Sequence, residues 1–121
     1  DQYAPPRHTA RAPTGSLAKL LAWQIESPLT KEEVLCHQSD FISARLLGNE
    51  SPVKSDWHNC LKLGYDVRQN KWPEWIESCL TSAGISNPLG GDDGVIPLQV
   101  VSPGQPIGTI SSDMSESLGL P

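Results

Sequence analysis

The chain has 121 residues, the length of one ordinary domain, and a formal net charge of −5. This acidic balance argues against non-specific nucleic-acid binding, which requires clustered lysine and arginine side chains. Only 37% of the residues are hydrophobic, and the 11 prolines and 10 glycines are typical of a loop-rich chain or of a segment of a larger fold. No apolar run approaches the roughly 20 residues of a membrane-spanning helix. The opening residues, DQYAPP, contain no signal-peptide core.

The three cysteines, Cys36, Cys60 and Cys79, are widely spaced and form no CxxC pair. An odd number with this spacing predicts reduced thiols in helices or core, as in intracellular proteins. His37 and His58 lie next to or near a cysteine, but neither cluster has the spacing of a metal-ligand set. We therefore predict no metal site in this chain.

The first predicted helix follows a proline-rich start. Residues 1–13 carry three prolines and show no periodicity, so we expect an extended leading segment. Thr14 can cap a helix that Pro28 ends, and Trp23 within it is expected in the core. Apolar residues recur along this helix at the spacing of one face: Leu17, Leu20, Leu21 and Ile25.

A short strand and a second helix are predicted next. Residues 34–37 (VLCH) have the apolar character of a short buried strand. Ser39 and Asp40 offer an N-cap for a helix over residues 41–47 (FISARLL). Gly48 directly after it suits the end of a helix. Residues 49–55 are then expected to form a loop.

The middle of the chain predicts a strand, a turn and a third helix. Residues 61–65 (LKLGY) alternate in the manner of a strand. Residues 66–71 are polar and predict a turn. Pro73 suits the first position of a helix that Gly84 ends, and Trp75 in this helix is expected in the core.

The C-terminal third predicts two short strands and a last helix. Residues 86–94 (SNPLGGDDG) are the best candidate for a loop. Residues 95–101 are expected to form a strand, followed by a turn over residues 102–106. A second strand is predicted over residues 107–110, and Ser112 and Asp113 are expected to cap a last short helix that runs to Leu118 and ends at Gly119.

The densest polar cluster in the middle of the chain is residues 55–59 (SDWHN). Asp56 in this cluster can accept a proton from a substrate hydroxyl. From the local sequence alone, the favoured interpretation is that Asp56 caps a turn or helix. The glycine-rich residues 89–94 lack the Lys-Ser/Thr pair of a phosphate-binding loop, and a solvated loop is expected there rather than a cation site.

Three segments, in order along the chain, resemble the N-terminal lobe of FGGY carbohydrate kinases. They are residues 37–48 (HQSDFISARLLG), residues 55–72 (beginning SDWHNCLKLGYD), and residues 100–110 (VVSPGQPIGTI) followed by residues 118–121 (LGLP). Residues 8–23 (HTARAPTGSLAKLLAW) extend the likeness to the plant and cyanobacterial branch of D-ribulose and xylulose kinases.

The resemblance implies roles for three residues. Asp56 matches the family's base, which removes the proton from the sugar hydroxyl that attacks the γ-phosphoryl group of ATP. Asn59 matches an asparagine near that base and is expected to help hold the substrate site, and Trp57 lies where some relatives have a substrate-contacting residue. Lys19 aligns with the lysine of a family Lys-x-x-Trp signature, but Trp23 is one residue too far along, so Lys19 receives no catalytic role.

The resemblance also implies a fold. Residues 1–121 are expected to be part of an α/β lobe of the ribonuclease H-like, actin-like type, and incomplete by themselves. Residues 14–85 would hold the helices and strands around Asp56, and residues 95–121, after the 86–94 loop, would lead toward a C-terminal lobe. The family's phosphate loop and C-terminal lobe, which bind most of the ATP and Mg²⁺, are expected outside this chain. No cofactor or metal site is therefore expected within it, and the isolated chain should be inactive.

The function expected from the resemblance is that of a fragment of an ATP-dependent pentulose kinase, with D-ribulose favoured over D-xylulose. Its partners would be the sugar and the remaining segments of the kinase, without nucleic acid or membrane. The alternative is a catalytically inactive kinase-like subunit that serves assembly or interaction in a larger complex. The plant-like resemblance points to an intracellular location in the chloroplast, with the cytoplasm as the alternative.

Overall fold

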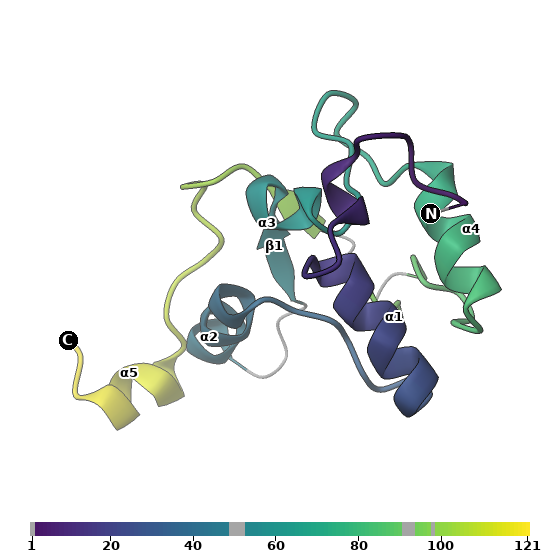
Figure 1. Cartoon of the computed structure of the whole chain (residues 1–121). Coiled ribbons are helices and arrows are strands. Elements are labelled where there is room, and N and C mark those ends of the chain that lie inside the picture. Colours follow the sequence, from purple (N-terminus) through teal and green to yellow (C-terminus); the bar gives the residue numbers. More distant parts are fainter. Residues whose placement is uncertain (1, 49–52, 91–93, 98) are drawn as a thin grey trace.

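The computed structural model describes residues 2–48, 53–90, 94–97 and 99–121. These residues form a short 3-10 helix, five α-helices and two strands, so the chain is a small mixed domain compatible with the predicted α/β class (Figure 1). In chain order the elements are η1 (Thr9–Arg11), α1 (Ser16–Glu26), α2 (Gln38–Leu47), β1 (Lys54–Asp56), α3 (Trp57–Leu61), α4 (Glu74–Ser82), β2 (Gln99–Val101) and α5 (Ser112–Leu118).

The two strands lie at the centre of the molecule. In Figure 1, α1, α4 and the N-terminal segment lie on one side of β1 and α3, and α2 and α5 lie on the other side. β1 pairs with β2 in parallel, with Ser55 opposite Val100 and Asp56 opposite Val101. The carboxyl ends of both strands therefore lie at the same end of the sheet, and Asp56 is the last residue of β1 there.

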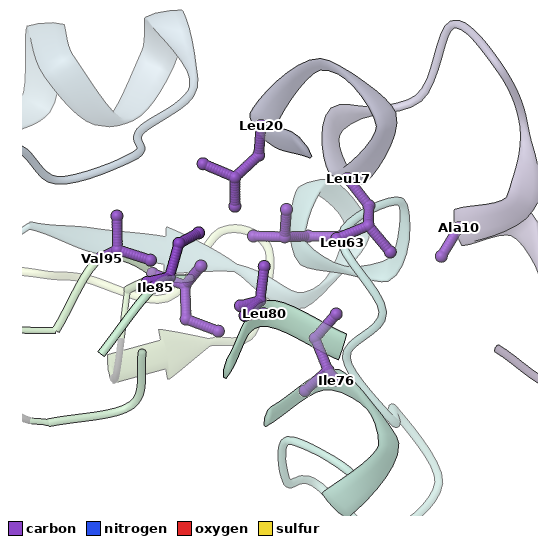
Figure 2. Close-up of a cluster of buried hydrophobic side chains, with 9 residues drawn as sticks. Ala10, Leu17, Leu20, Leu63, Ile76, Leu80, Ile85 and Val95 are labelled. Carbon is purple, nitrogen blue, oxygen red and sulfur yellow. The ribbon is translucent and has the colours of Figure 1, made fainter. Parts of the chain in front are cut away.

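The hydrophobic core fills the space between α1, α4 and the strands (Figure 2). The buried faces of α1 and α4 meet there, because each helix carries apolar residues at a spacing of three or four. The segments after α3 and α4 and before β2 complete it. The cluster consists of Ala10, Leu17, Leu20, Leu63, Ile76, Leu80, Ile85, Val95 and Ile96.

The prediction of α1 is confirmed, but its N-cap is Gly15 rather than Thr14, and two of its residues lie on other faces than expected. Ile25 was expected on the buried face but is 83% exposed, and Gln24 is buried in its place. Gln24 can lie inside because its Oε1 accepts the backbone N–H of Leu29 at 2.8 Å, which satisfies the buried amide. Trp23 was expected in the core, yet half of its surface is exposed. Trp75 does pack partly buried against the core.

The second helix begins earlier than predicted. α2 starts at Gln38, and its N-cap is His37 rather than Ser39 or Asp40. Asp40 instead occupies the third helical position, where its carboxylate accepts the backbone N–H of His37 in a capping box. Gly48 ends the helix as predicted, at a φ of 107°.

Two of the predicted strands are not strands. Residues 34–37 form no strand. Among the described residues, their one backbone hydrogen bond to a distant segment runs from Leu35 N–H to the Val95 carbonyl, at 2.7 Å. Residues 61–65 begin as the end of α3 and continue as a turn. Gly64 makes that turn possible, because its φ is 118° and an added Cβ would lie 2.7 Å from the Trp75 ring. The turn, not a strand, buries Leu63 and Tyr65.

The predicted C-terminal strands are shorter than expected. Among the described residues of 95–101, Gln99–Val101 pair as a strand, and Val95 and Ile96 are buried in a bend. Residues 107–110 form no strand. The leading segment 1–13 is also not extended throughout, because it contains the η1 turn that buries Ala10.

The remaining predicted turns and helices form where the structure describes them, but two helix starts differ: Pro73 is not the first helical residue of α4, and the N-cap of α5 is Ser111 rather than Ser112 or Asp113. Asp66 pairs with Lys71 across the predicted polar turn. Pro73 is the N-cap of α4, one residue before its first helical position. Gly119 ends α5 in the left-handed conformation. Residues 49–52 of the predicted 49–55 loop, residues 91–93 of the predicted 86–94 loop, and residue 98 lie outside the described residues.

Much apolar surface lies outside the core. The accessible surface is 8111 Å², whereas a compact monomer of this mass would have about 6,400 Å². Phe41 and Ile42 on α2, and Leu118 and Leu120 at the C-terminal end, are all exposed. In the part of the chain that the structure describes, no third strand pairs with β1 or β2. A parallel pair of strands is unusual by itself, because parallel sheets are normally covered on both faces.

Candidate functional site

Asp56 lies at the junction between a strand and a helix. It is the last residue of β1 and the N-cap of α3. Its Oδ1 accepts the backbone N–H of Asn59 at 3.0 Å, and its Oδ2 accepts the side-chain Nδ2–H of Asn59 at 2.8 Å. The capping role that the local sequence favoured is therefore present, and it fixes the side chains of Asp56 and Asn59 against each other.

A pocket of about 480 Å³ opens where β1 and β2 end. In open α/β sheets, ligands bind outside the carboxyl ends of parallel strands, so this is the edge at which a site is expected. The turn of residues 102–105, which follows β2, forms one wall. The polar residues of the other walls are Ser39, Asp40, Ser43, Lys54, Ser55, Asp56, His58 and Asn59.

The capping bonds leave the Asp56 carboxylate able to act on a ligand. Each carboxylate oxygen has two lone-pair directions, and each oxygen of Asp56 accepts one hydrogen bond from Asn59. One direction therefore remains on each oxygen. At the start of the same strand, Lys54 Nζ donates to the Ile107 carbonyl at 3.1 Å, which holds the chain after β2 at the pocket.

A buried polar cluster lies behind β1. Asp40 is only 4% exposed. Its Oδ2 accepts the backbone N–H of His37 at 2.9 Å and lies 3.0 Å from His37 Nδ1. Ser16 Oγ lies 3.2 Å from His37 Nε2, and Ser55 Oγ lies 3.4 Å from His37 Nδ1. The cluster thus joins α1, α2 and β1 at the residue that precedes Asp56.

The charge of Asp40 is stabilised by these contacts. Burial by itself would raise the pKa of Asp40, but hydrogen bonds from the His37 side chain, the His37 backbone and Ser55 outweigh it, and the pKa is lowered. Because an ionised carboxylate only accepts hydrogen bonds, His37 Nδ1 carries the proton. In the neutral ring, Nε2 then accepts the hydroxyl of Ser16.

All three cysteines are free thiols, as predicted. Cys60 in α3 is fully buried, and this burial raises its pKa to about 11, with the nearby charges of Asp40 and Asp56 acting in the same direction and a hydrogen bond with Ser55 opposing them. Burial also raises the pKa of Cys36 and of Cys79, which are both partly accessible.

Cys60 should resist alkylation in the folded chain. At pH 8 a thiol with a pKa of about 11 is thiolate in about one molecule in a thousand, and the thiolate is the nucleophile. Iodoacetamide should modify Cys36 and Cys79 while leaving Cys60 intact, and should modify all three in guanidinium chloride. Peptide mass spectrometry measures this directly. Equal labelling of Cys60 and Cys79 in native buffer would contradict the burial of α3.

The structure brings together two of the three residues that the sequence nominated. Asp56 and Asn59 both line the pocket and are hydrogen-bonded to each other. Trp57 packs edge-on against His58, with ring centroids 6.2 Å apart, and is not among the residues that line the pocket. A substrate contact by Trp57 stays a prediction.

Sequence reasoning missed a second pocket, of about 800 Å³, on the other side of Asn59. Ser39 and Asn59 line both pockets. The second pocket is also lined by Ser16, Lys19 and Trp23. Their spacing of i, i+3 and i+7 is the signal that would have placed them on one face of α1.

Among the residues that the structure describes, no three His, Cys, Asp or Glu side chains come together as metal ligands would. No helix in the same residues is long and apolar enough to cross a membrane. No model of a known protein family matches the chain.

Proposed function

We propose that this chain is a segment of an ATP-dependent carbohydrate kinase of the FGGY type, which phosphorylates a hydroxyl of a pentulose and prefers D-ribulose to D-xylulose. The observation that carries the proposal is the position of Asp56. Its carboxylate ends a parallel strand and borders a polar pocket at the strands' carboxyl edge. The plant-like resemblance adds a chloroplast as the proposed location.

Asp56 would act as the base of the transfer step. A carboxylate beside the sugar can orient the attacking hydroxyl and accept its proton, while phosphoryl transfer otherwise depends on positioning and charge neutralisation. Asn59 would hold Asp56 through the 2.8 Å bond from its Nδ2. The hydroxyls of Ser39 and Ser43 and the amide of Gln105 line the same pocket and suit the remaining hydroxyls of a pentulose.

ATP and Mg²⁺ would be bound mainly by segments outside these residues. The large accessible surface and the exposed apolar residues of α2 support further strands and helices against this chain, and so does the lack of a third strand beside β1 and β2 among the described residues. We therefore expect the 121 residues alone to be inactive, and the catalytic test belongs in the polypeptide or assembly in which they occur.

Replacing Asp56 with asparagine should lower kcat for ATP-dependent phosphorylation of D-ribulose by at least about a hundredfold, because a general base contributes 10²–10⁴. The amide keeps the shape and one capping oxygen but cannot take the proton. Asp113→Asn, on exposed α5, is the matched control and should leave kcat unchanged. The assay follows ADP release with D-ribulose and with D-xylulose as the sugar.

Three results would contradict the kinase. They are an intact assembly that phosphorylates neither sugar, an Asp56→Asn assembly as active as the unmodified one, and an Asp113→Asn assembly that loses activity equally. Circular dichroism of each variant separates loss of the base from loss of the fold.

A non-catalytic subunit is the second candidate. It is favoured by the capping bonds, because they give both oxygens of Asp56 a structural role without any substrate. The exposed Phe41 and Ile42 would then contact a partner subunit. Native mass spectrometry distinguishes the two candidates. A kinase segment should travel with further kinase segments, whereas an assembly subunit should travel with unrelated chains and show no sugar phosphorylation.

A further inference from the structure

The larger, 800 Å³ pocket has no part in the proposed transfer step. It lies between α1 and the segment that leads into α2, and Asp56 is not among its lining residues. It meets the Asp56 pocket only through Ser39 and Asn59. The polar side chains around it are Ser16, Lys19, His37, Gln38, Ser39 and Asn59.

One face of α1 supplies the main wall of this pocket. Ser16, Lys19 and Trp23 follow one another along the helix at i, i+3 and i+7, while Leu17 and Leu20 turn toward the core. The inward pair anchors the helix, so the stripe that faces the pocket is held by packing that does not depend on a ligand. Lys19 and Trp23 are therefore presented on a fixed surface.

The charge of this pocket is opposite to that of the chain. The net charge of the protein is −5, yet no carboxylate is among the described residues that line the pocket. Lys19 makes no ion pair among the described residues and is the one formal cation in the lining. Asp40 lies behind His37, bonded through His37 Nδ1 and N–H, and does not border the pocket. An anion in the pocket would meet Lys19 without a competing carboxylate in the wall.

Trp23 adds a flat apolar surface beside that cation. It is 50% exposed, although an indole ring is normally buried. Its Nε1–H makes no hydrogen bond with the described residues. A ligand with an apolar face and a nearby acceptor would satisfy both parts of the side chain.

We propose that this pocket binds a phosphorylated sugar, with the phosphate at Lys19 and the sugar carbons against Trp23. Lysine is a common point-charge partner of phosphate. The amides of Gln38 and Asn59 and the hydroxyl of Ser39 provide donors and acceptors for sugar hydroxyls. The site is distinct from the Asp56 pocket, and binding there does not require phosphoryl transfer.

The test uses the indole N–H signals of the ¹⁵N-labelled 121-residue chain. The chain has four tryptophans, so the other three indoles serve as internal references. Trp23→Phe assigns the signal of Trp23 by its loss. D-ribose 5-phosphate should shift that signal in a saturable way. D-ribose and inorganic phosphate, each offering half of the ligand, should bind at least about tenfold more weakly.

Lys19→Gln should weaken D-ribose 5-phosphate binding by about tenfold or more, since a hydrogen bond to a charged group is at stake. Lys31→Gln removes the same charge from an exposed turn outside the pocket and should change the affinity less than twofold. Ser43→Ala changes a residue that lines only the Asp56 pocket and should also leave the affinity unchanged, so this proposal and the kinase proposal can fail separately.

Several outcomes would overturn the proposal. Equal affinity for D-ribose and D-ribose 5-phosphate would show that the pocket does not recognise the phosphate group. If Lys19→Gln keeps the affinity for D-ribose 5-phosphate, or if Lys31→Gln loses as much affinity as Lys19→Gln, the phosphate does not bind at Lys19. Shifts confined to the other three indoles would place the ligand elsewhere. Unchanged spectral dispersion in each variant confirms that the fold is intact.

Discussion

Replacing Leu80 with alanine should lower the free energy of unfolding by about 2–5 kcal/mol. The side chain is fully buried on α4 and belongs to the core cluster with Leu20, Leu63 and Ile76. Truncation loses the transfer free energy of the removed carbons and leaves a cavity, because three different segments line the site and cannot all close on it.

That loss is large for this molecule. A chain of 121 residues typically has a total stability of about 6–18 kcal/mol, and a small core with much exposed apolar surface places this chain toward the lower end. Urea unfolding followed by tryptophan fluorescence measures the change. The control is Ile25→Ala on α1, which also truncates an aliphatic side chain, but one that is 83% exposed. It should change the free energy of unfolding by no more than about 0.5 kcal/mol. A Leu80→Ala loss below that of the control would mean that the cluster is not packed.

The helices could be predicted from the sequence because their signals are local. Gly48 ends α2 and Pro73 precedes the first residue of α4, and each acts only on the adjacent turn of its helix. The faces were harder to predict. Periodicity alone places Ile25 with Leu17, but the chain beyond α1 bonds to Gln24 instead and turns that part of the helix inward.

The strands could not be predicted well, because apolar alternation also occurs in buried turns. Leu63 and Tyr65 alternate as in a strand, yet Asp56 starts a helix just before them and Gly64 reverses the chain between them. β1 itself has no apolar pattern. It is a strand because β2, distant in sequence, pairs with it.

The candidate site could be predicted only in part, because some of its contacts are local in sequence and others depend on tertiary packing. Asp56 and Asn59 are three residues apart, the spacing of a cap and its donor, so their contact is a local property. The pocket beside them needs the β1–β2 pairing, which brings the turn after Val101 next to Asp56. The cluster of His37, Asp40 and Ser55 likewise depends on tertiary packing between α2 and β1.

Replacing Asp40 with asparagine should lower the free energy of unfolding at pH 7 by about 1.5 kcal/mol or more, since hydrogen bonds to a charged group are weakened in a buried setting. The amide keeps the shape of the carboxyl group but not its charge, and the bonds from His37 N–H and Nδ1–H lose that charge. The exposed Glu26→Gln removes one negative charge from the end of α1 and is the control, expected within about 0.5 kcal/mol of the unmodified chain.

The difference between the unmodified chain and Asp40→Asn should depend on pH in one direction. The folded pKa of Asp40 is lowered below its unfolded value of about 3.9. The stabilisation is therefore complete above the unfolded pKa and is lost as the pH falls through the folded one. Urea unfolding at pH 5, 4 and 3 should give the full difference at pH 5 and a smaller one at pH 3. A difference that grew toward acid would mean that Asp40 is protonated in the folded chain, and that the charge behind β1 does not hold the strand that presents Asp56.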